Sequence, residues 1–515
     1  MTRLAFAIRV CSLVFLSATL TPRVSAQVIG LKTVPLAAGD PFLIFPSQNL
    51  GMGAASFALQ DALADPFANP ATGVRTTDSR VFSVPTFYSV SDEHGGARTM
   101  PIGIQLRSET WFGGGMVALQ DVDQGRAASN WQWARPLDGD FMLPNPHLLA
   151  ERSATNRFAQ IYLGRELGDT WSLGASALVV GINGTDGVEQ LYANAWDIIE
   201  HGSLEEYRVG LVGQLSGDRV VELSVVRSHS EMTQDVTSVT WALTDSANWL
   251  WTPTVDEEAH RNVTKTWGAQ VSYQQPLEAP GWTAGGSFTV NRKDHPKIPT
   301  YDLLAVQLAE RPPIPRDPGN SWAFVIGAGL AYEKGPTTFG VDVAYEPALS
   351  DTWADELVDV TAADGSVIPA GDHTVDNHFD FSNVSARLGL DQKFKESWAF
   401  QLGVRMRSYS YRMEQKDYVL GLDRSLMQQW TEWTPSWGIS YDLDGIELSY
   451  VGLASAAGHF PFLDFGNSDE FPVVWLPQAE DQLVGGDILA PPAGGLLTPD
   501  QTTVTHRLQI SLPIR

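Results

Sequence analysis

Apolar and polar residues alternate with a period of two along most of the chain. The clearest example is Trp398–Met406, in which every second residue is apolar while Gln401, Gly403 and Arg405 lie between them. Successive side chains of a β-strand point to opposite faces, so this pattern predicts a strand with one apolar and one polar face. The same alternation recurs in 207–211, 221–225, 322–332, 339–345 and 446–450.

These predicted strands come in pairs that short turns join. Six hairpins start near residues 156, 206, 262, 321, 379 and 436, with turns near 168–169, 216–218, 279–281, 334–336, 394–396 and 443–445. Longer loops are expected over roughly 183–205, 230–260, 293–319, 349–377, 413–429 and 457–501. Short turns on one side and long loops on the other are typical of transmembrane β-barrels.

The predicted fold class is all-β, an antiparallel transmembrane barrel of about 14–16 strands. Aromatic residues at strand ends favour it, because such rings prefer a membrane–water boundary. A soluble β-sandwich or propeller is the alternative. The larger count comes from the six hairpins, a last strand at Thr503–Ile514, and three early segments at Val81–Val90, Thr99–Arg107 and Trp111–Val122.

The first 26 residues have the order of a Sec-type signal peptide. Arg3 and Arg9 precede the apolar run Val10–Leu20, and residues 24–26 are small enough for cleavage. An apolar run of about 11 residues is too short for a spanning helix, which needs roughly 20. Mean hydropathy is −0.11. After residue 26, no apolar run is as long as a spanning helix. These observations exclude a helical membrane protein and predict export to the bacterial outer membrane.

Loss of the signal would change the composition in two ways. The single cysteine, Cys11, would leave with it, which excludes disulfides, zinc–thiolate sites and cysteine nucleophiles. Three arginines and no acid would also leave, so the formal charge would fall from −26 to −29. A nucleic-acid partner needs a basic footprint, which this chain lacks. The expected partners are outer-membrane lipid, a hydrophobic small molecule and, during biogenesis, the barrel assembly machinery.

Residues 27–80 lack the alternation of barrel strands. Leu50–Gly73 is rich in Gly and Ala. Within it, Gly51 and Gly53 permit close backbone approach, and Asn69-Pro70 sets a turn. We interpret the stretch as a plug folded inside the lumen, with a flexible periplasmic extension as the alternative. The predicted domains are a signal peptide (1–26), an N-terminal plug (27–80) and a barrel (81–515).

This stretch resembles the plug of the FadL-type family, outer-membrane transporters of long-chain fatty acids and hydrocarbons. The matching residues are Gly51, Gly53, Asp61, Asp65, Asn69, Pro70 and Ala71. The resemblance covers roughly residues 50–182, and PorV-like secretion-associated barrels have a similar Asn-Pro-Ala start. Two features depart from the family: it has 14 strands, and this chain ends on Leu-Pro-Ile-Arg515 instead of an aromatic residue.

Two predicted loops are rich in aromatic rings and form a candidate capture surface for an apolar ligand. One holds Trp241, Trp249 and Trp251, and the other holds Phe460, Phe462, Phe465 and Trp475. The alternative is that these rings only pack the loops against each other.

The sequence predicts no enzyme, no metal and no cofactor. His201-Gly202-Ser203 lies in a predicted loop, where adjacency does not create a catalytic pair, and Asp372–His378 is interpreted as a solvated acidic loop. The lumen charges, Asp342, Arg387, Arg405, Arg407 and Glu447, are interpreted as hydrating the interior. The predicted function is passive uptake of hydrophobic molecules such as long-chain fatty acids or hydrocarbons. A structural or secretion-associated barrel and a general porin are the alternatives.

Overall fold

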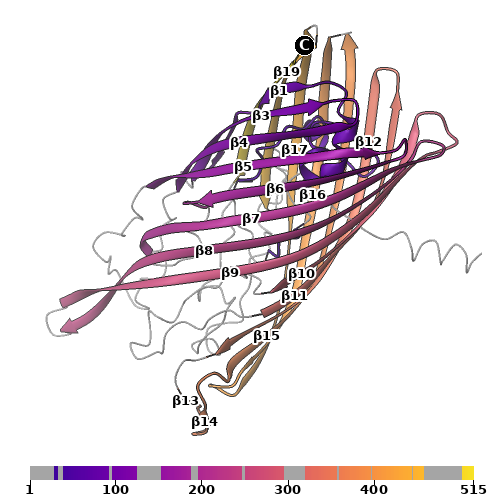
Figure 1. Cartoon of the computed structure of the whole chain (residues 1–515). Coiled ribbons are helices and arrows are strands. Elements are labelled where there is room, and N and C mark those ends of the chain that lie inside the picture. The colour runs from indigo at the N-terminus through magenta and orange to yellow at the C-terminus, as the bar shows by residue number, and fades with distance from the viewer. Residues whose placement is uncertain are drawn as a thin grey trace, which may run out of the picture.

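The structure is a computed structural model. It describes residues 28–32, 39–91, 95–124, 152–186, 195–245, 250–294, 319–355, 359–395, 397–443, 445–457 and 502–514. The predicted signal peptide and the predicted ring-rich segment 460–475 lie outside these ranges. Figure 1 shows strands that wrap around a lumen, with the C-terminus at one end of the molecule.

Seventeen of the described strands form one closed antiparallel sheet. Two short strands, β1 (Arg80–Ser83) and β2 (Thr86–Val90), occupy a single position, because both pair with β3 and with β19. The ring therefore has 16 positions, the larger of the predicted counts. The others are β3 (Gly95–Arg107), β4 (Trp111–Gln124), β5 (Arg152–Leu167), β6 (Trp171–Ile182), β7 (Ala195–Leu215), β8 (Arg219–Asp245), β9 (Leu250–Pro276), β10 (Trp282–Asp294), β11 (Gly319–Lys334), β12 (Thr337–Asp355), β15 (His373–Lys395), β16 (Trp398–Asp417), β17 (Leu422–Leu443), β18 (Ile446–Ala457) and β19 (Thr502–Pro513).

All six predicted hairpins and the predicted last strand are confirmed. Their apolar faces point outward and their polar faces point into the barrel, as predicted. Large apolar side chains on the outer face are exposed, for example Val117 at 62% and Ile161 at 63%. Polar side chains of the same strands face inward and are buried, among them Gln105, Gln120 and Gln160. An apolar outside and a polar inside are what lipid around a water-filled or polar lumen requires.

The predicted long loops 230–260 and 413–429 are wrong, because most of their described residues are strand, whereas 295–318 and 458–501 lie outside the described residues. Strands β8 and β9 each run for 27 residues and cover most of the predicted loop 230–260. At about 3.3 Å per residue they extend roughly 90 Å, far beyond the 9–11 residues that cross a bilayer. Strands β7, β12, β15, β16 and β17 likewise extend into predicted loops. Beyond the apolar band both faces carry polar residues, so the period-two signal fades although the backbone stays extended.

Helical structure in the described residues is short and lies near the N-terminus. It comprises two 3₁₀ turns, η1 (Leu50–Met52) and η2 (Pro70–Arg75), and one turn of α-helix, α2 (Asp65–Ala68). None of the described helices is long and apolar enough to cross a membrane. A separate two-stranded sheet, β13 (Val360–Thr361) with β14 (Val367–Ile368), lies beyond the long-strand end, opposite the short turns (Figure 1).

Candidate functional site

Residues 39–79, here called the inner segment, lie inside the ring of strands. Inward-facing side chains hold their backbone from several sides. Gln105 of β3 donates to Leu63 O (3.0 Å), and Gln160 of β5 donates to Phe67 O (3.0 Å). On another side, Ser436 of β17 accepts from Gly53 N (2.9 Å) and donates to Gly51 O (3.0 Å). The segment is therefore tied to the wall on several sides of the lumen, and its short helices, drawn in indigo, lie among the strands in Figure 1.

Two lumen charges that the sequence assigned to hydration contact the inner segment instead. The carboxylate of Asp342 on β12 accepts from Ser56 N (2.7 Å) and from Phe57 N (3.2 Å). Arg387 on β15 donates to Ala54 O (3.3 Å) and lies 4.0 Å from Asp342. Asp342 is only 3% exposed, so the charge is balanced by backbone N–H groups and by Arg387 and not by water.

The motif residues fold the inner segment upon itself. The carboxylate of Asp61 accepts from Ser47 Oγ (2.7 Å), Gln48 N (2.7 Å) and Ala64 N (3.1 Å), which joins the two halves of the segment. The side chain of Asn69 accepts from Ala71 N (3.2 Å) and caps η2.

Asp65 and Asn69 also take part in contacts with Arg75 and the wall. Asp65 lies 3.4 Å from Arg75, which forms an ion pair with Glu222 of β8. The amide of Asn69 donates to the same Glu222 (3.4 Å). The Asn-Pro-Ala turn is thus fixed both internally and to the barrel wall.

Glycines of the wall let the inner segment approach closely, and the sequence analysis did not identify them. A Cβ at Gly403 would overlap Gly53 N, and one at Gly389 would overlap Met52 O. These two glycines face each other across β15 and β16. Likewise Gly285 and Gly329 are cross-strand partners beside Phe57. A pair of lumen-facing glycines on neighbouring strands could have indicated this close approach. Such a pair can be recognised only when the register between the two strands is known.

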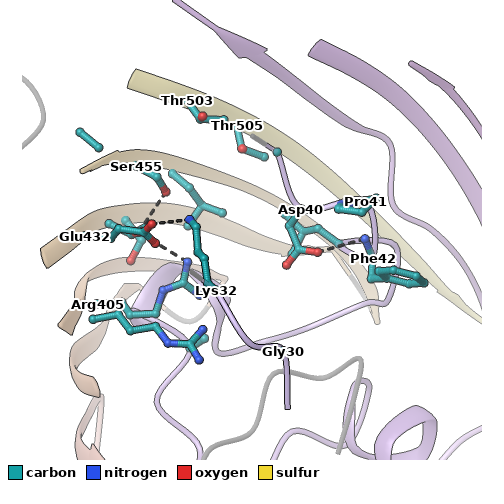
Figure 2. A pocket seen from close by; sticks show the side chains of 18 of the residues that line it. Gly30, Lys32, Asp40, Pro41, Phe42, Arg405, Glu432, Ser455, Thr503 and Thr505 are labelled. Carbon is teal, nitrogen blue, oxygen red and sulfur yellow. Dashed lines mark hydrogen bonds and ion pairs between the residues drawn. The ribbon is translucent and has the colours of Figure 1, made fainter. Parts of the chain in front are cut away.

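A cavity of about 680 Å³ lies between the N-terminal residues and the wall formed by β16–β19. Its lining carries three cations, Lys32, Arg405 and Arg407, and two carboxylates, Asp40 and Glu432. Figure 2 shows Lys32 and Glu432 pointing toward one another, with Arg405 nearby and Asp40, Pro41 and Phe42 across the space. Lys32 forms an ion pair with Glu432, and Arg407 with Glu346.

An aromatic cluster on the inner wall adjoins this cavity. Tyr409, which lines the cavity, stacks on Trp430 at a centroid distance of 4.8 Å. Phe381 packs against Tyr411 at 5.6 Å, and Ile29 and Leu31 pack against the same cluster. Its buried members are Ala323, Ala348, Phe379, Phe381, Tyr409, Tyr411, Met413 and Trp430. The site therefore joins a charged region to an apolar one.

The candidate capture residues are only partly placed. Trp241 and Trp251 belong to strands β8 and β9, so the predicted loop around them is wrong. Trp249 lies outside the described residues, as do Phe460, Phe462, Phe465 and Trp475. Their role as a capture surface stays a prediction.

The dismissed catalytic and metal candidates lie on strands. His201 is exposed on β7 with its Nδ1 3.7 Å from Asp235. Residues 373–378 belong to strand β15, so the predicted loop at 372–378 is mostly wrong. On this strand His373 contacts Asp376 (2.7 Å) and His378 contacts Asp351 (2.6 Å). Within the described residues, no three His, Cys, Asp or Glu side chains are arranged to hold a metal ion.

Comparison with known proteins gives matches of fold only. No family model matches the chain, and no curated protein matches its sequence. It is similar to the structure of a FadL homologue of Pseudomonas aeruginosa, with 10% identity over 94% of this chain and 100% of that one and a TM-score of 0.46. It is also similar to the Ralstonia pickettii toluene transporter TbuX, with 10% identity over 92% of this chain and 100% of that one and a TM-score of 0.38. A third similar structure is CdiB from Acinetobacter baumannii, with 10% identity over 85% of this chain and 60% of that one and a TM-score of 0.36. At these scores the likeness assigns neither family nor function.

Proposed function

We propose that this protein is an outer-membrane channel for the passive uptake of hydrophobic small molecules that carry an acidic head, such as long-chain fatty acids. The supporting observation is the cavity, which brings Lys32, Arg405 and Arg407 next to the aromatic cluster inside a closed barrel. Lys32 and Arg407 are paired with Glu432 and Glu346, so a bound carboxylate would be oriented chiefly by the guanidinium of Arg405. A hydrocarbon tail would contact the apolar part of the cavity lining, which includes Phe42, Leu43, Leu453 and Tyr409.

The apolar part supplies most of the binding free energy in this proposal. Burial of one methylene group contributes about 0.8 kcal/mol, so ten buried groups would contribute about 8 kcal/mol. The cations would orient the molecule and favour acids over alkanes of equal length. A general porin for polar solutes would not need apolar lining residues such as Phe42, Leu43 and Leu453.

The inner segment serves as the plug in this proposal, within the N-terminal region 27–80. Its many hydrogen bonds to the wall keep it in place, so water and ions have no wide path, while an apolar ligand binds beside it. The apolar outer face supports a position in lipid, and the predicted signal peptide (1–26) would provide export. The strand wall, 81–515 in the domain prediction, would span the membrane.

Uptake of two matched compounds tests the proposal. Cells without other routes, with or without the protein, are given a radiolabelled long-chain fatty acid or an alkane of equal length. We expect the protein to raise uptake of the acid. Arg405→Gln should lower acid uptake about tenfold and leave alkane uptake unchanged, because a charge-assisted hydrogen bond contributes about 1.5–3 kcal/mol.

Arg412→Gln is the control, because Arg412 lies on the same strand but is exposed and paired with Glu414 (2.8 Å). Equal uptake with and without the protein contradicts a transport function. Equal loss of acid and alkane uptake in Arg405→Gln contradicts the acidic head. Copurification of a protein partner, without transport, favours the structural or secretion-associated alternative.

A further inference from the structure

Five outward-facing side chains form a row across strands β7 to β11, here called the outer row. They are Tyr207, Arg227, Trp267, Arg292 and Trp322, and each lies opposite the next in the register of neighbouring strands. Aromatic rings and guanidinium groups therefore alternate along the row. All five side chains are exposed, Trp267 at 55% and Trp322 at 46%.

The rings of the outer row position its arginines. The guanidinium carbon of Arg227 lies 5.4 Å from the ring centroid of Trp267, and that of Arg292 lies 5.9 Å from the centroid of Trp322. A guanidinium against a ring keeps its N–H groups available at its edge. Arg292 Nε lies 3.7 Å from the exposed Asp294, and Arg227 has no ion pair with any other described residue.

The outer row marks the edge of the apolar band. Toward the short turns, the next outward row is apolar, and it consists of Val209, Val225, Ala269, Val290 and Phe324. Toward the long-strand end, the next row is polar, and it consists of Glu205, His229, Lys265, Asp294 and Asn320. Short turns of such barrels face the periplasm, so this edge meets the outer leaflet.

We propose that the outer row binds the phosphate group of an anionic lipid of the outer leaflet. Arginine donates paired hydrogen bonds to phosphate, and the apolar row beside it would contact the acyl chains. Charge complementarity supports this occupant, because two cations and no acid lie in this row of a chain with 60 acidic and 34 basic residues. The inference rests on the membrane insertion in the proposed function.

The neighbouring strands do not continue this pattern. Beyond Trp322 the same line of register partners continues with Leu349, then Asp380, then Arg412, which is paired with Glu414. Before Tyr207 it holds Ala177 and then Ile161. The feature is thus confined to β7–β11, which predicts a local lipid site and not a belt around the whole barrel.

Lipid binding by the purified full-length protein in detergent tests the proposal. The probe is a multiply acylated glucosamine disaccharide bisphosphate, compared with the same lipid without phosphates, and native mass spectrometry measures the retained fraction. We expect the phosphorylated lipid to be retained about tenfold more, the ratio that one charge-assisted hydrogen bond can supply. Arg227→Gln with Arg292→Gln should abolish this preference, whereas Arg412→Gln should keep it.

The outcomes separate this inference from the proposed function. Heat-modifiable mobility in SDS is measured first on every variant, and a wild-type chain that never forms a detergent-stable barrel overturns both proposals. A stable barrel that retains both lipids equally, or a double variant that keeps the preference, overturns the lipid site while fatty-acid uptake still stands. Equal binding of the unacylated sugar bisphosphate would show a soluble-anion site and overturn the lipid assignment.

Discussion

At the scale of single residues, Asp342 anchors the inner segment through two backbone N–H groups. Asp342→Ala would leave the N–H groups of Ser56 and Phe57 without their acceptor. An unsatisfied buried donor costs about 1–3 kcal/mol. We expect amide exchange at residues 56 and 57 to speed up about 10- to 100-fold, measured by hydrogen exchange with mass spectrometry. Glu346→Ala is the control, because Glu346 faces inward on the same strand but pairs with Arg407. Unchanged exchange in Asp342→Ala would contradict the anchoring role.

Adjacent glycines of β10 give a second prediction at this scale. A Cβ at Gly285 would overlap Phe57 O, whereas the nearest atom to a Cβ at Gly286 is Gly327 O at 3.5 Å. Gly285→Val should displace the inner segment, because backbone cannot yield as a flexible side chain does. We expect limited proteolysis to cut within residues 50–60 of Gly285→Val and not of Gly286→Val. Equal protection in both variants would show that the close approach is unimportant.

From the sequence, only the inner-segment residues of these contacts could be identified, and not their partners on the barrel wall. Gly53 has φ +67°, and the prediction that it permits close approach agrees with its position against Val404 O and Gly403. The facing glycines and the Asp342–Arg387 pair were missed. They come from distant strands, and only the register shows that they meet the inner segment. A charge at a lumen position looks the same in the sequence whether water or backbone solvates it.

At the scale of elements, strands were predictable wherever one face is apolar and the other polar. The alternation in Trp398–Met406 reproduces the exposed and inward faces of β16. The extended ends of β8 and β9 were not predictable in this way, because polar and apolar residues are mixed along this stretch and no regular period-two pattern remains. Many residues there are β-branched or otherwise compatible with extended backbone, which is a weaker signal than periodicity.

The β8–β9 extension gives a prediction for an element. Gln234 and His260 face each other across this hairpin, and residues 235–259 lie beyond them. Replacing 235–259 by an Asn-Gly turn should leave the barrel folded, because the removed strands pair mainly with each other at their tips. Heat-modifiable mobility and the melting temperature should be unchanged. Uptake of fatty acid should fall, since Trp241, Trp249 and Trp251 are the predicted capture residues. Full uptake by the shortened protein would contradict that capture role.

At the scale of the whole molecule, the proposed plug role of the inner segment makes a prediction about water conduction. A ring of 16 strands is wide enough to leave an aqueous channel when nothing fills it. Here the lumen holds residues 39–79, which contact β3, β5, β12 and β17 among other strands. Deleting Asp40–Thr76 should therefore change single-channel conductance in planar bilayers from near baseline to the large steps of a water-filled barrel.

The deletion also uncovers buried wall residues such as Phe112, Phe158 and Tyr162, so its folding must be verified by heat-modifiable mobility. Gly285→Val provides an independent reading, because it keeps the whole chain and only displaces the segment. Its conductance should lie between those of the wild type and the deletion, while Gly286→Val should behave as the wild type. If the deletion variant inserts but conducts no better than the wild type, residues 39–79 do not close the lumen. The barrier to water would then lie in another part of the chain.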